Sequence, residues 1–190
     1  MIYYTADLHF GHENVIRFCG RPYETVEEMD RALLEGWNAR VRSEDTVYIV
    51  GDLFYRNRRQ AGEYLTELKG HKVLILGNHD HSWLTDNLRD SFEEVSQMMI
   101  IQDAGNRITL CHYPMMTWSG EKKGAYMVYG HIHNHAEDLD YWPLIARKDH
   151  MLNAGVDVNW YIPVTLQEMI SNNATFRCQH ALAPDARQKE

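Results

Sequence analysis

The side chains best suited to chemistry are histidines, aspartates and one asparagine that follow short apolar segments. The chain has 190 residues, of which 11 are histidines. The motifs are, in chain order, Asp7-Leu8-His9, Gly51-Asp52, Gly77-Asn78-His79-Asp80, His112 and Gly130-His131-Ile132-His133. Carboxylate, imidazole and amide groups, with no thiolate among them, favour ions such as manganese, iron or zinc over a structural thiolate site. The motifs therefore predict a metal centre.

The spacing within the motifs indicates how ions could be held. Residues two apart on an extended segment point the same way, so Asp7 and His9 can bind one ion, and His131 and His133 can line one edge of a shared site. Asp52 stands alone after its glycine and is the candidate for a carboxylate that bridges two ions. Two dications that share only Asp7 and Asp52 as anionic side chains keep excess positive charge, which would bind phosphate and acidify a bridging water.

The elements that must position these motifs are short strands alternating with helices. Apolar and β-branched runs predict strands at 2–6, 46–50 and 72–76, and later at 95–102, 107–111, 125–129 and 151–159. Helical spacing predicts helices at 25–41, 61–68 and 82–88, and a short final helix capped by Thr165. This order predicts an α/β core of two packed sheets with helices outside. Because ligand sites lie beyond the carboxyl ends of strands in such sheets, we expect the motifs to converge.

Length and composition predict one domain over 1–180 and a flexible tail over 181–190. No run of 18 apolar residues occurs, so we expect a cytoplasmic protein with no membrane partner. The three cysteines are far apart and outside any CxxC pattern, which argues against a disulfide framework. The net charge of −8 argues against a protein that tracks nucleic acid, and leaves a small phosphorylated substrate as the expected partner. A homodimer is the base-rate expectation for the assembly.

The order D-x-H, G-D, G-N-H-D, H and G-H-x-H resembles the signature of the calcineurin-like metallophosphoesterases. The resemblance spans residues 7–133, and the segment 7–14 is similar to that of small bacterial and phage phosphoesterases of about this length. It implies a four-layer sandwich of two mixed β-sheets flanked by helices. It also implies a dinuclear metal site and hydrolysis of a phosphate mono- or diester. Manganese is the first expectation for both ions, with iron, zinc, nickel and magnesium as alternatives.

Matched residue by residue, the resemblance implies that one ion is bound by Asp7, His9, Asp52 and His133. The other would be bound by Asp52, Asn78, His112 and His131. It implies a hydroxide that bridges the ions and attacks phosphorus, with Asp52 as the shared ligand. His79 would donate a proton to the leaving oxygen or stabilise the phosphoryl group as a cation. Asp80 would orient His79 and raise its pKa.

Three further groups of residues are open to two interpretations. His12, Asn14 and Arg17 are candidates for contacts with the substrate phosphate, although a polar loop leading into a helix has the same pattern. Arg56, Arg58 and Arg59 either meet an anionic substrate or begin a solvated helix. The stretch 113–124, with Met115, Met116 and Trp118, either forms a wall of the pocket or covers the core or a self-association surface. The segment 153–157, which ends at Asp157, is expected to pack against the sheet.

Two other classes of function compete with the phosphoesterase. A non-catalytic interaction scaffold on the same fold would lack some of the ligands, and none is missing from this sequence. A nuclease would be expected to carry a basic groove or an added DNA-binding domain, and the acidic balance and short length offer neither.

Overall fold

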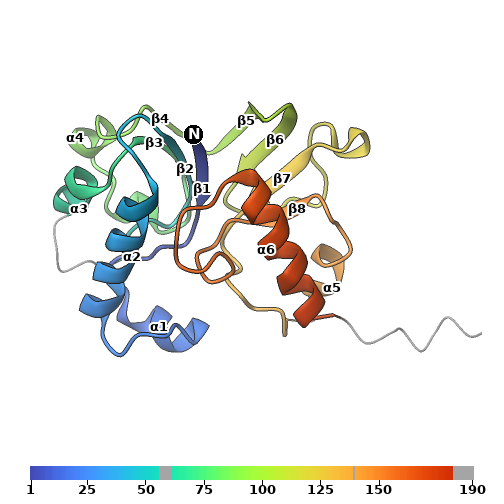
Figure 1. The fold of residues 1–190 in the computed structure, drawn as a ribbon, viewed down its shortest axis with the longest axis horizontal. Coiled ribbons are helices and arrows are strands. Elements are labelled where there is room, and N and C mark those ends of the chain that lie inside the picture. Colours follow the sequence, from blue (N-terminus) through green and yellow to red (C-terminus); the bar gives the residue numbers. More distant parts are fainter. Residues whose placement is uncertain (56–60, 139, 182–190) are drawn as a thin grey trace, which may run out of the picture.

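The computed structural model describes residues 1–55, 61–138 and 140–181. Two four-stranded sheets lie face to face, and helices cover the outer side of each one (Figure 1). The expected four-layer α/β sandwich is therefore confirmed.

The first sheet comes from the N-terminal half of the chain. Its strands, in spatial order, are β1 (Ile2–Thr5), β2 (Thr46–Val50), β3 (His71–Ile75) and β4 (Glu94–Ser96). All three pairings are parallel, so the carboxyl ends of the strands meet at one edge. The helices α1 (Glu13–Cys19), α2 (Val26–Arg40) and α3 (Ala61–Glu67) supply Val15, Met29, Trp37 and Leu65 to the apolar core on the outer face.

The second sheet has mixed pairing. Its strands are β5 (Met98–Asp103), β6 (Asn106–Cys111), β7 (Tyr126–Tyr129) and β8 (Met151–Asn153), in that order. The β5–β6 pair is antiparallel and the other two pairs are parallel. Mixed pairing was expected for both sheets but occurs in the second and not in the first. In the first sheet, long connections bring each strand back in the same direction as its neighbour.

A shared apolar core joins the two sheets. Tyr4, Val50 and Ile75 from the first sheet pack with Leu110 and Val128 from the second. These side chains are fully buried. Helix α6 (Leu166–Gln179) adds Leu166 and Met169 to the same core. On the outer face of the second sheet, α5 (Trp142–Ile145) supplies Trp142 and Ile145 to a third cluster.

Two strand predictions were wrong in extent. The run 95–102 is divided between two sheets, since β4 pairs with β3 and β5 pairs with β6. The run 151–159 stops being a strand after Asn153, because the Asn153 side chain accepts a hydrogen bond from the Gly155 amide (2.7 Å). Asn159 then donates to the carbonyls of Asn153 and Gly155, both at 2.9 Å, which stabilises a tight turn in place of extended backbone.

The helix predictions were most accurate where a cap defined the first turn. Thr165 and Glu168 form a full capping box at the start of α6, which is longer than the short helix expected. Thr25 caps α2 by accepting from the Glu28 amide. The helix expected at 82–88 is instead a 3-10 turn, η1 (Asp80–Ser82), followed by α4 (Asp86–Arg89). The backbone of Thr85 between them is extended (φ −92°, ψ 165°), so the two turns do not join into one helix.

Some sequence predictions fall outside the described residues. Arg56, Arg58 and Arg59 lie there, as does all of the expected tail except residue 181. None of the helices in the described part of the chain has the length and apolar character needed to cross a membrane.

Candidate metal centre

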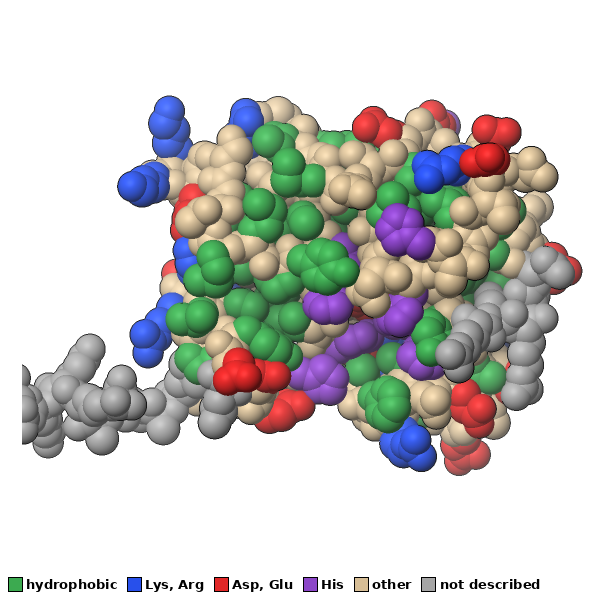
Figure 2. All heavy atoms as spheres, turned by 180° about the vertical axis from the view of Figure 1, so that it is seen from behind, with side chains coloured by type: hydrophobic (Ala, Val, Ile, Leu, Met, Phe, Trp, Pro, Cys, Tyr) green, Lys and Arg blue, Asp and Glu red, His purple; other side chains and the backbone are tan. Residues whose placement is uncertain are grey.

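The predicted metal ligands come together at the carboxyl ends of strands from both sheets. Asp7, Asp52 and Asn78 follow β1, β2 and β3, whereas His112 and His131 follow β6 and β7. Figure 2 shows histidine side chains gathered in a band across the middle of one face of the molecule. Residues more than 100 positions apart in the chain thus share one site, as the strand-end argument predicted.

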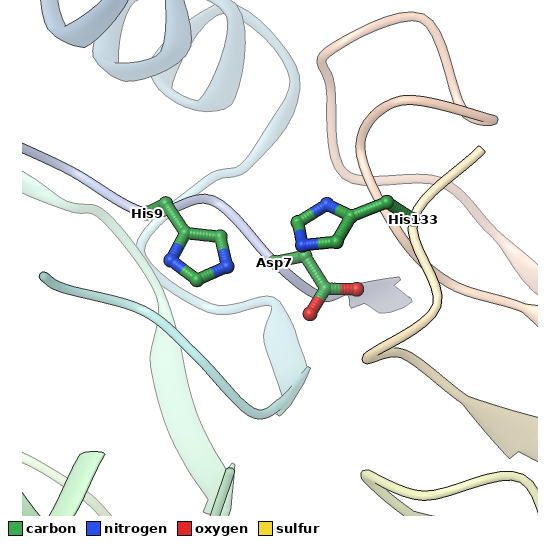
Figure 3. A group of neighbouring side chains, drawn as sticks. All are labelled: Asp7, His9 and His133. Atoms are coloured by element: carbon green, nitrogen blue, oxygen red, sulfur yellow. The ribbon is translucent and has the colours of Figure 1, made fainter. Parts of the chain in front are cut away.

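One group of ligand atoms is formed by Asp7, His9 and His133. Their carboxylate and imidazole atoms lie within 4.8 Å of one another. Figure 3 shows the two imidazole rings and the carboxylate pointing toward a common space. Asp7 is fully buried and His9 is 2% exposed, so the group is largely shielded from water.

A second group is formed by Asp52, His112 and His131, again within 4.8 Å. Asn78 completes this group, because its Oδ1 lies 3.1 Å from His112 Nε2 and 3.0 Å from His131 Nδ1. His112 Nδ1 donates to the Val50 carbonyl at 2.9 Å, which leaves Nε2 to face the site. Each of the two groups therefore offers carboxylate and imidazole donors of the kind that divalent ions bind.

Asp52 lies between the two groups. Its Oδ2 is 3.7 Å from His9 Nε2 in the first group and 3.4 Å from His112 Nε2 in the second. Burial alone would raise the pKa of Asp52. The hydrogen bond and charge of His112 and the hydrogen bond from the His79 amide outweigh burial, so the pKa of Asp52 is lowered. The Asp52 side chain is thus an anion placed where a carboxylate could contact two cations.

The backbone of the ligands adopts an unusual conformation. Five predicted ligands have positive φ: Asp7 (55°), His9 (54°), Asp52 (56°), His131 (72°) and His133 (49°). In the described part of the chain only three other non-glycine residues do, Ala104, Trp160 and Tyr161. Left-handed backbone costs of order 1–3 kcal/mol at a non-glycine residue and is concentrated at functional sites. The fold therefore maintains a strained loop geometry at the positions predicted to bind metal.

Glycines stand directly before Asp52, Asn78 and His131, and they make room for the ligand side chains. A Cβ atom at Gly77 would lie 2.2 Å from Asp52 Oδ1, and one at Gly130 would lie 2.7 Å from Asp7 Oδ2. A Cβ at Gly51 would lie 2.2 Å from His112 Nδ1. The ligand side chains thus occupy the space that a larger residue would need.

His9 provides a test of whether a metal fits the site. Both of its ring nitrogens are buried and have no hydrogen-bond partner among the described residues. Burial, together with the nearby charges of His133 and Arg21, places the pKa of His9 well below its ordinary value, so the ring is neutral at pH 7. A buried neutral imidazole with an unused lone pair is a costly arrangement that a cation would satisfy. A divalent ion bound at the site would accept this lone pair, so the donor set of the site fits such an ion.

His133 is held by a partner that the sequence did not identify. Its Nδ1 is 2.8 Å from Asp157 Oδ2, and the Asp157 side chain is fully buried. Burial alone would lower the pKa of His133, but the Asp157 hydrogen bond and the charge of Asp7 raise it to about 11. A carboxylate behind a ligating histidine fixes which ring nitrogen faces the metal, and metal binding there would displace a proton.

Arg21 joins Asp157 to the first motif. Its Nε lies 2.8 Å from Asp157 Oδ1, while Nη2 and Nη1 donate to the carbonyls of Asp7 (2.7 Å) and Leu8 (2.9 Å). Asn153 adds a further contact by donating to the His133 carbonyl at 2.7 Å. The segment 153–157 was expected only to pack against the sheet, yet it positions His133. An aspartate next to apolar Val156 and Val158 was the available signal, since a buried carboxylate needs a partner.

The structure places His79 at the site and pairs the Asp80 carboxylate with groups other than the His79 imidazole. The His79 amide donates to Asp52 Oδ1 at 2.9 Å, and its Nε2 lies 3.9 Å from Asp52 Oδ2. The Asp80 carboxylate accepts hydrogen bonds from the amides of Asp52, Leu53 and Gly77 and from the Trp83 indole, at 2.8–3.0 Å. None of these bonds involves the His79 imidazole. Asp80 therefore holds the two loops that carry Asp52 and Asn78, because four N–H groups occupy its oxygens.

The predicted substrate contacts divide into two sets. His12 lies beside the first group, with its ring centroid 5.2 Å from that of His9 and 3.8 Å from that of Tyr55. Asn14 and Arg17 are exposed on α1, and the described contact of Arg17 is with the Phe18 ring, at 5.7 Å. The structure thus brings His12 to the site, whereas no described contact joins Asn14 or Arg17 to the ligands.

The two packed four-stranded sheets flanked by helices are the fold of the calcineurin-like phosphoesterases. The model of the calcineurin-like phosphoesterase family matches residues 1–181, and the chain belongs to this family.

The chain is similar to proteins from archaea, bacteria and phages. An uncharacterised protein of Methanocaldococcus jannaschii is 36% identical over 171 residues, which is 89% of each chain. The gene 66 protein of Mycobacterium phage L5 is 29% identical over 162 residues, 70% of this chain and 77% of the phage protein. A crystal structure of a protein of unknown function from Aquifex aeolicus superposes with a TM-score of 0.68 and 26% identity, covering 90% of this chain and 98% of that one.

Proposed function

We propose that the protein is a metal-dependent phosphoesterase that hydrolyses a phosphate mono- or diester at a pair of divalent ions. The observation that carries this proposal is the position of Asp52 Oδ2, 3.7 Å from His9 Nε2 and 3.4 Å from His112 Nε2. A carboxylate oxygen that faces an imidazole of each of two separate ligand groups is the arrangement that a bridging ligand requires.

Seven residues would hold the ions in this proposal. The first ion is assigned to Asp7, His9, Asp52 and His133, and the second to Asp52, Asn78, His112 and His131. A bound pair of divalent ions supplies charge neutralisation at the phosphoryl oxygens and lowers the pKa of water at the site. We propose manganese for both positions.

The remaining chemistry belongs to His79. Its side chain is 36% exposed, so it can reach a bound substrate, and its amide is tied to Asp52. We assign it the role of proton donor to the leaving oxygen. The hydrogen bond from the His79 amide to Asp52 would position His79. Asp80 would contribute by holding the loop that carries His79.

Hydrolysis of two model esters tests the function. Protein stripped of metal by a chelator is assayed with bis-p-nitrophenyl phosphate and p-nitrophenyl phosphate, before and after addition of Mn²⁺, Fe²⁺, Zn²⁺, Ni²⁺ or Mg²⁺. We expect turnover that depends on metal and is abolished in Asp52→Asn, while Asp86→Asn, whose carboxylate is fully exposed, behaves as wild type. The ratio of the two rates separates diesterase from monoesterase. If no metal restores turnover of either ester, the phosphoesterase assignment fails and the scaffold interpretation is favoured.

A further inference from the structure

A loop beside the metal centre presents apolar side chains to solvent. Tyr113 is 47% exposed and Met116 is 50% exposed, although both are large and apolar. On the face that carries the histidines, green side chains lie directly next to them (Figure 2). We refer to the exposed side chains of Tyr113 and Met116 as the 113/116 surface.

The loop that carries this surface is held in place from below. Met115 packs against the apolar cluster of Trp118 and Met127. The Trp118 indole donates to the Ala125 carbonyl at 2.8 Å, and Lys148 Nζ donates to the Met116 carbonyl at 2.9 Å. Because the loop is already ordered, a ligand that binds the 113/116 surface pays little conformational entropy.

Tyr113 lies next to two of the predicted metal ligands. Its ring centroid is 4.7 Å from that of His131 and 5.2 Å from that of His112. Tyr55, on the side of the first group, is placed differently: it is half-buried and its ring lies 3.8 Å from His12 and 4.7 Å from His79. Tyr55 therefore fills space between histidines, whereas about half of Tyr113 is open to a ligand.

The chemistry of the 113/116 surface favours a flat, uncharged group. Residues 113–117 are Tyr, Pro, Met, Met and Thr, none of which is charged at neutral pH. Lys148, which binds this loop, is paired with Glu121. An exposed tyrosine and a methionine offer area for aromatic stacking and for sulfur contacts with a ring edge, and little to recognise a charged group.

We propose that Tyr113 and Met116 form a subsite for a planar aromatic group on the ester arm that the substrate keeps after hydrolysis. This inference rests on the proposed phosphoesterase function and makes the substrate a phosphodiester. His79, the assigned proton donor, lies against His9 and Tyr55 on the side of the first group. The leaving arm therefore points to that side, and the retained arm extends past His131 toward Tyr113. An aryl ring and a nucleobase share the required chemistry.

Three diesters with one leaving group test the subsite on the manganese-loaded protein. Phenyl, methyl and thymidine 5′ esters of p-nitrophenyl phosphate all release p-nitrophenolate, so they differ only in the retained arm. In Tyr113→Ala we expect the ratio of kcat/KM for the phenyl ester to that for the methyl ester to fall about five-fold, the size of one aromatic contact. Tyr113→Phe should keep the wild-type ratio. Ile100→Ala, which removes an exposed apolar side chain from β5, is the control and should keep it as well.

The outcomes separate the inference from the function on which it rests. A parallel fall for the thymidine ester identifies the arm as a nucleoside, and a fall for the phenyl ester alone identifies a smaller aryl group. An unchanged ratio, or an equal loss for all three esters, overturns the subsite. If the wild type hydrolyses none of them, the proposed function has failed. Calorimetry then measures the affinities for phenylphosphonate and methylphosphonate in the wild type and in Tyr113→Ala. The same preference for phenylphosphonate in both proteins would contradict the subsite.

Discussion

At the scale of single residues, the site depends on carboxylates whose surroundings differ. Asp52 faces three imidazoles, Asp80 accepts four N–H groups, and Asp157 is paired with Arg21 and His133. Asp52 is open to a cation, and Asp80 is saturated by three loop amides and the Trp83 indole. Asp157 acts through the histidine that it holds. The same side chain thus serves three purposes because its neighbours differ.

His79→Ala tests the role assigned to the proton donor. For a diester with a poor alkyl leaving group we expect a loss in kcat of about 100-fold, and for p-nitrophenyl esters a loss below about 10-fold, since only a poor leaving group needs the proton. Metal content measured by plasma emission should not change, because the amide that binds Asp52 remains in the variant. Equal losses for both leaving groups would exclude the acid role.

Asp157→Asn tests the partner of His133. The substitution removes the charge that orients the imidazole and leaves the side chain isosteric, so we expect manganese affinity to fall roughly 10- to 100-fold. Calorimetric titration of the chelator-stripped protein measures this. Asp86→Asn serves as the matched control on an exposed carboxylate. Wild-type affinity in Asp157→Asn would show that the contact with His133 is only structural.

At the scale of elements, the strand ends position the ligands and the glycines allow them to approach. Hydrogen bonding continues past the strands: the Asp7 amide donates to the Gly51 carbonyl and the His9 amide to the Asp52 carbonyl, both at 3.0 Å. The loops after β1 and β2 therefore run side by side while their residues adopt positive φ. Each element contributes one or two ligands, and the site exists only where the loops meet.

Gly77→Ala tests this close approach. The new Cβ would overlap Asp52 Oδ1 at 2.2 Å and the Asp52 amide at 2.6 Å, and neither can move without shifting the loop. We expect loss of bound metal and a decrease of about 2 kcal/mol in the free energy of unfolding. Gly62→Ala, in helix α3, is the control, because among the described residues the new Cβ would have a single neighbour within 4 Å, Leu88 Cδ2 at 3.4 Å. That variant should be neutral or more stable by about 0.5 kcal/mol, since alanine favours the helix. Normal metal content in Gly77→Ala would contradict the packing argument.

At the scale of the whole molecule, the site joins the two sheets. Asp7 from the first sheet accepts the His131 amide of the second at 3.0 Å and 2.9 Å, and His112 from the second donates to Val50 of the first. Ions held by ligands from both sheets would therefore link the two halves of the fold.

Metal should consequently stabilise the entire protein. At a manganese concentration 100 times Kd, each bound ion adds about 2.7 kcal/mol to the free energy of unfolding. For a chain of this length, each ion raises Tm by roughly 8 °C. Differential scanning calorimetry with and without manganese measures the shift. Asp52→Asn should show little of it, and an equal shift in both proteins would place the stabilising ion elsewhere.

Much of the fold could be predicted from the sequence, because the signals were local. The strands at 2–6, 46–50 and 72–76 and the capped helices were visible as apolar runs and first-turn residues, and each ends or begins within about two residues of its observed bound. The sequence did not predict that the chain passes from the first sheet to the second between β4 and β5. It also did not predict the turn after β8. Both depend on which partner a segment finds, and an apolar run does not specify its partner.

The sequence alone determined the kinds of ligand and their places at strand ends, since residue type and spacing are properties of the chain itself. The resemblance implied how the ligands divide into two groups, and the tertiary structure brings each group together and places Asp52 Oδ2 near an imidazole of both. The tertiary structure also decided that Asp80 holds loops and that Asp157 and Arg21 hold His133. Such roles depend on distances between residues far apart in the chain, and those distances exist only after the two sheets have packed on each other.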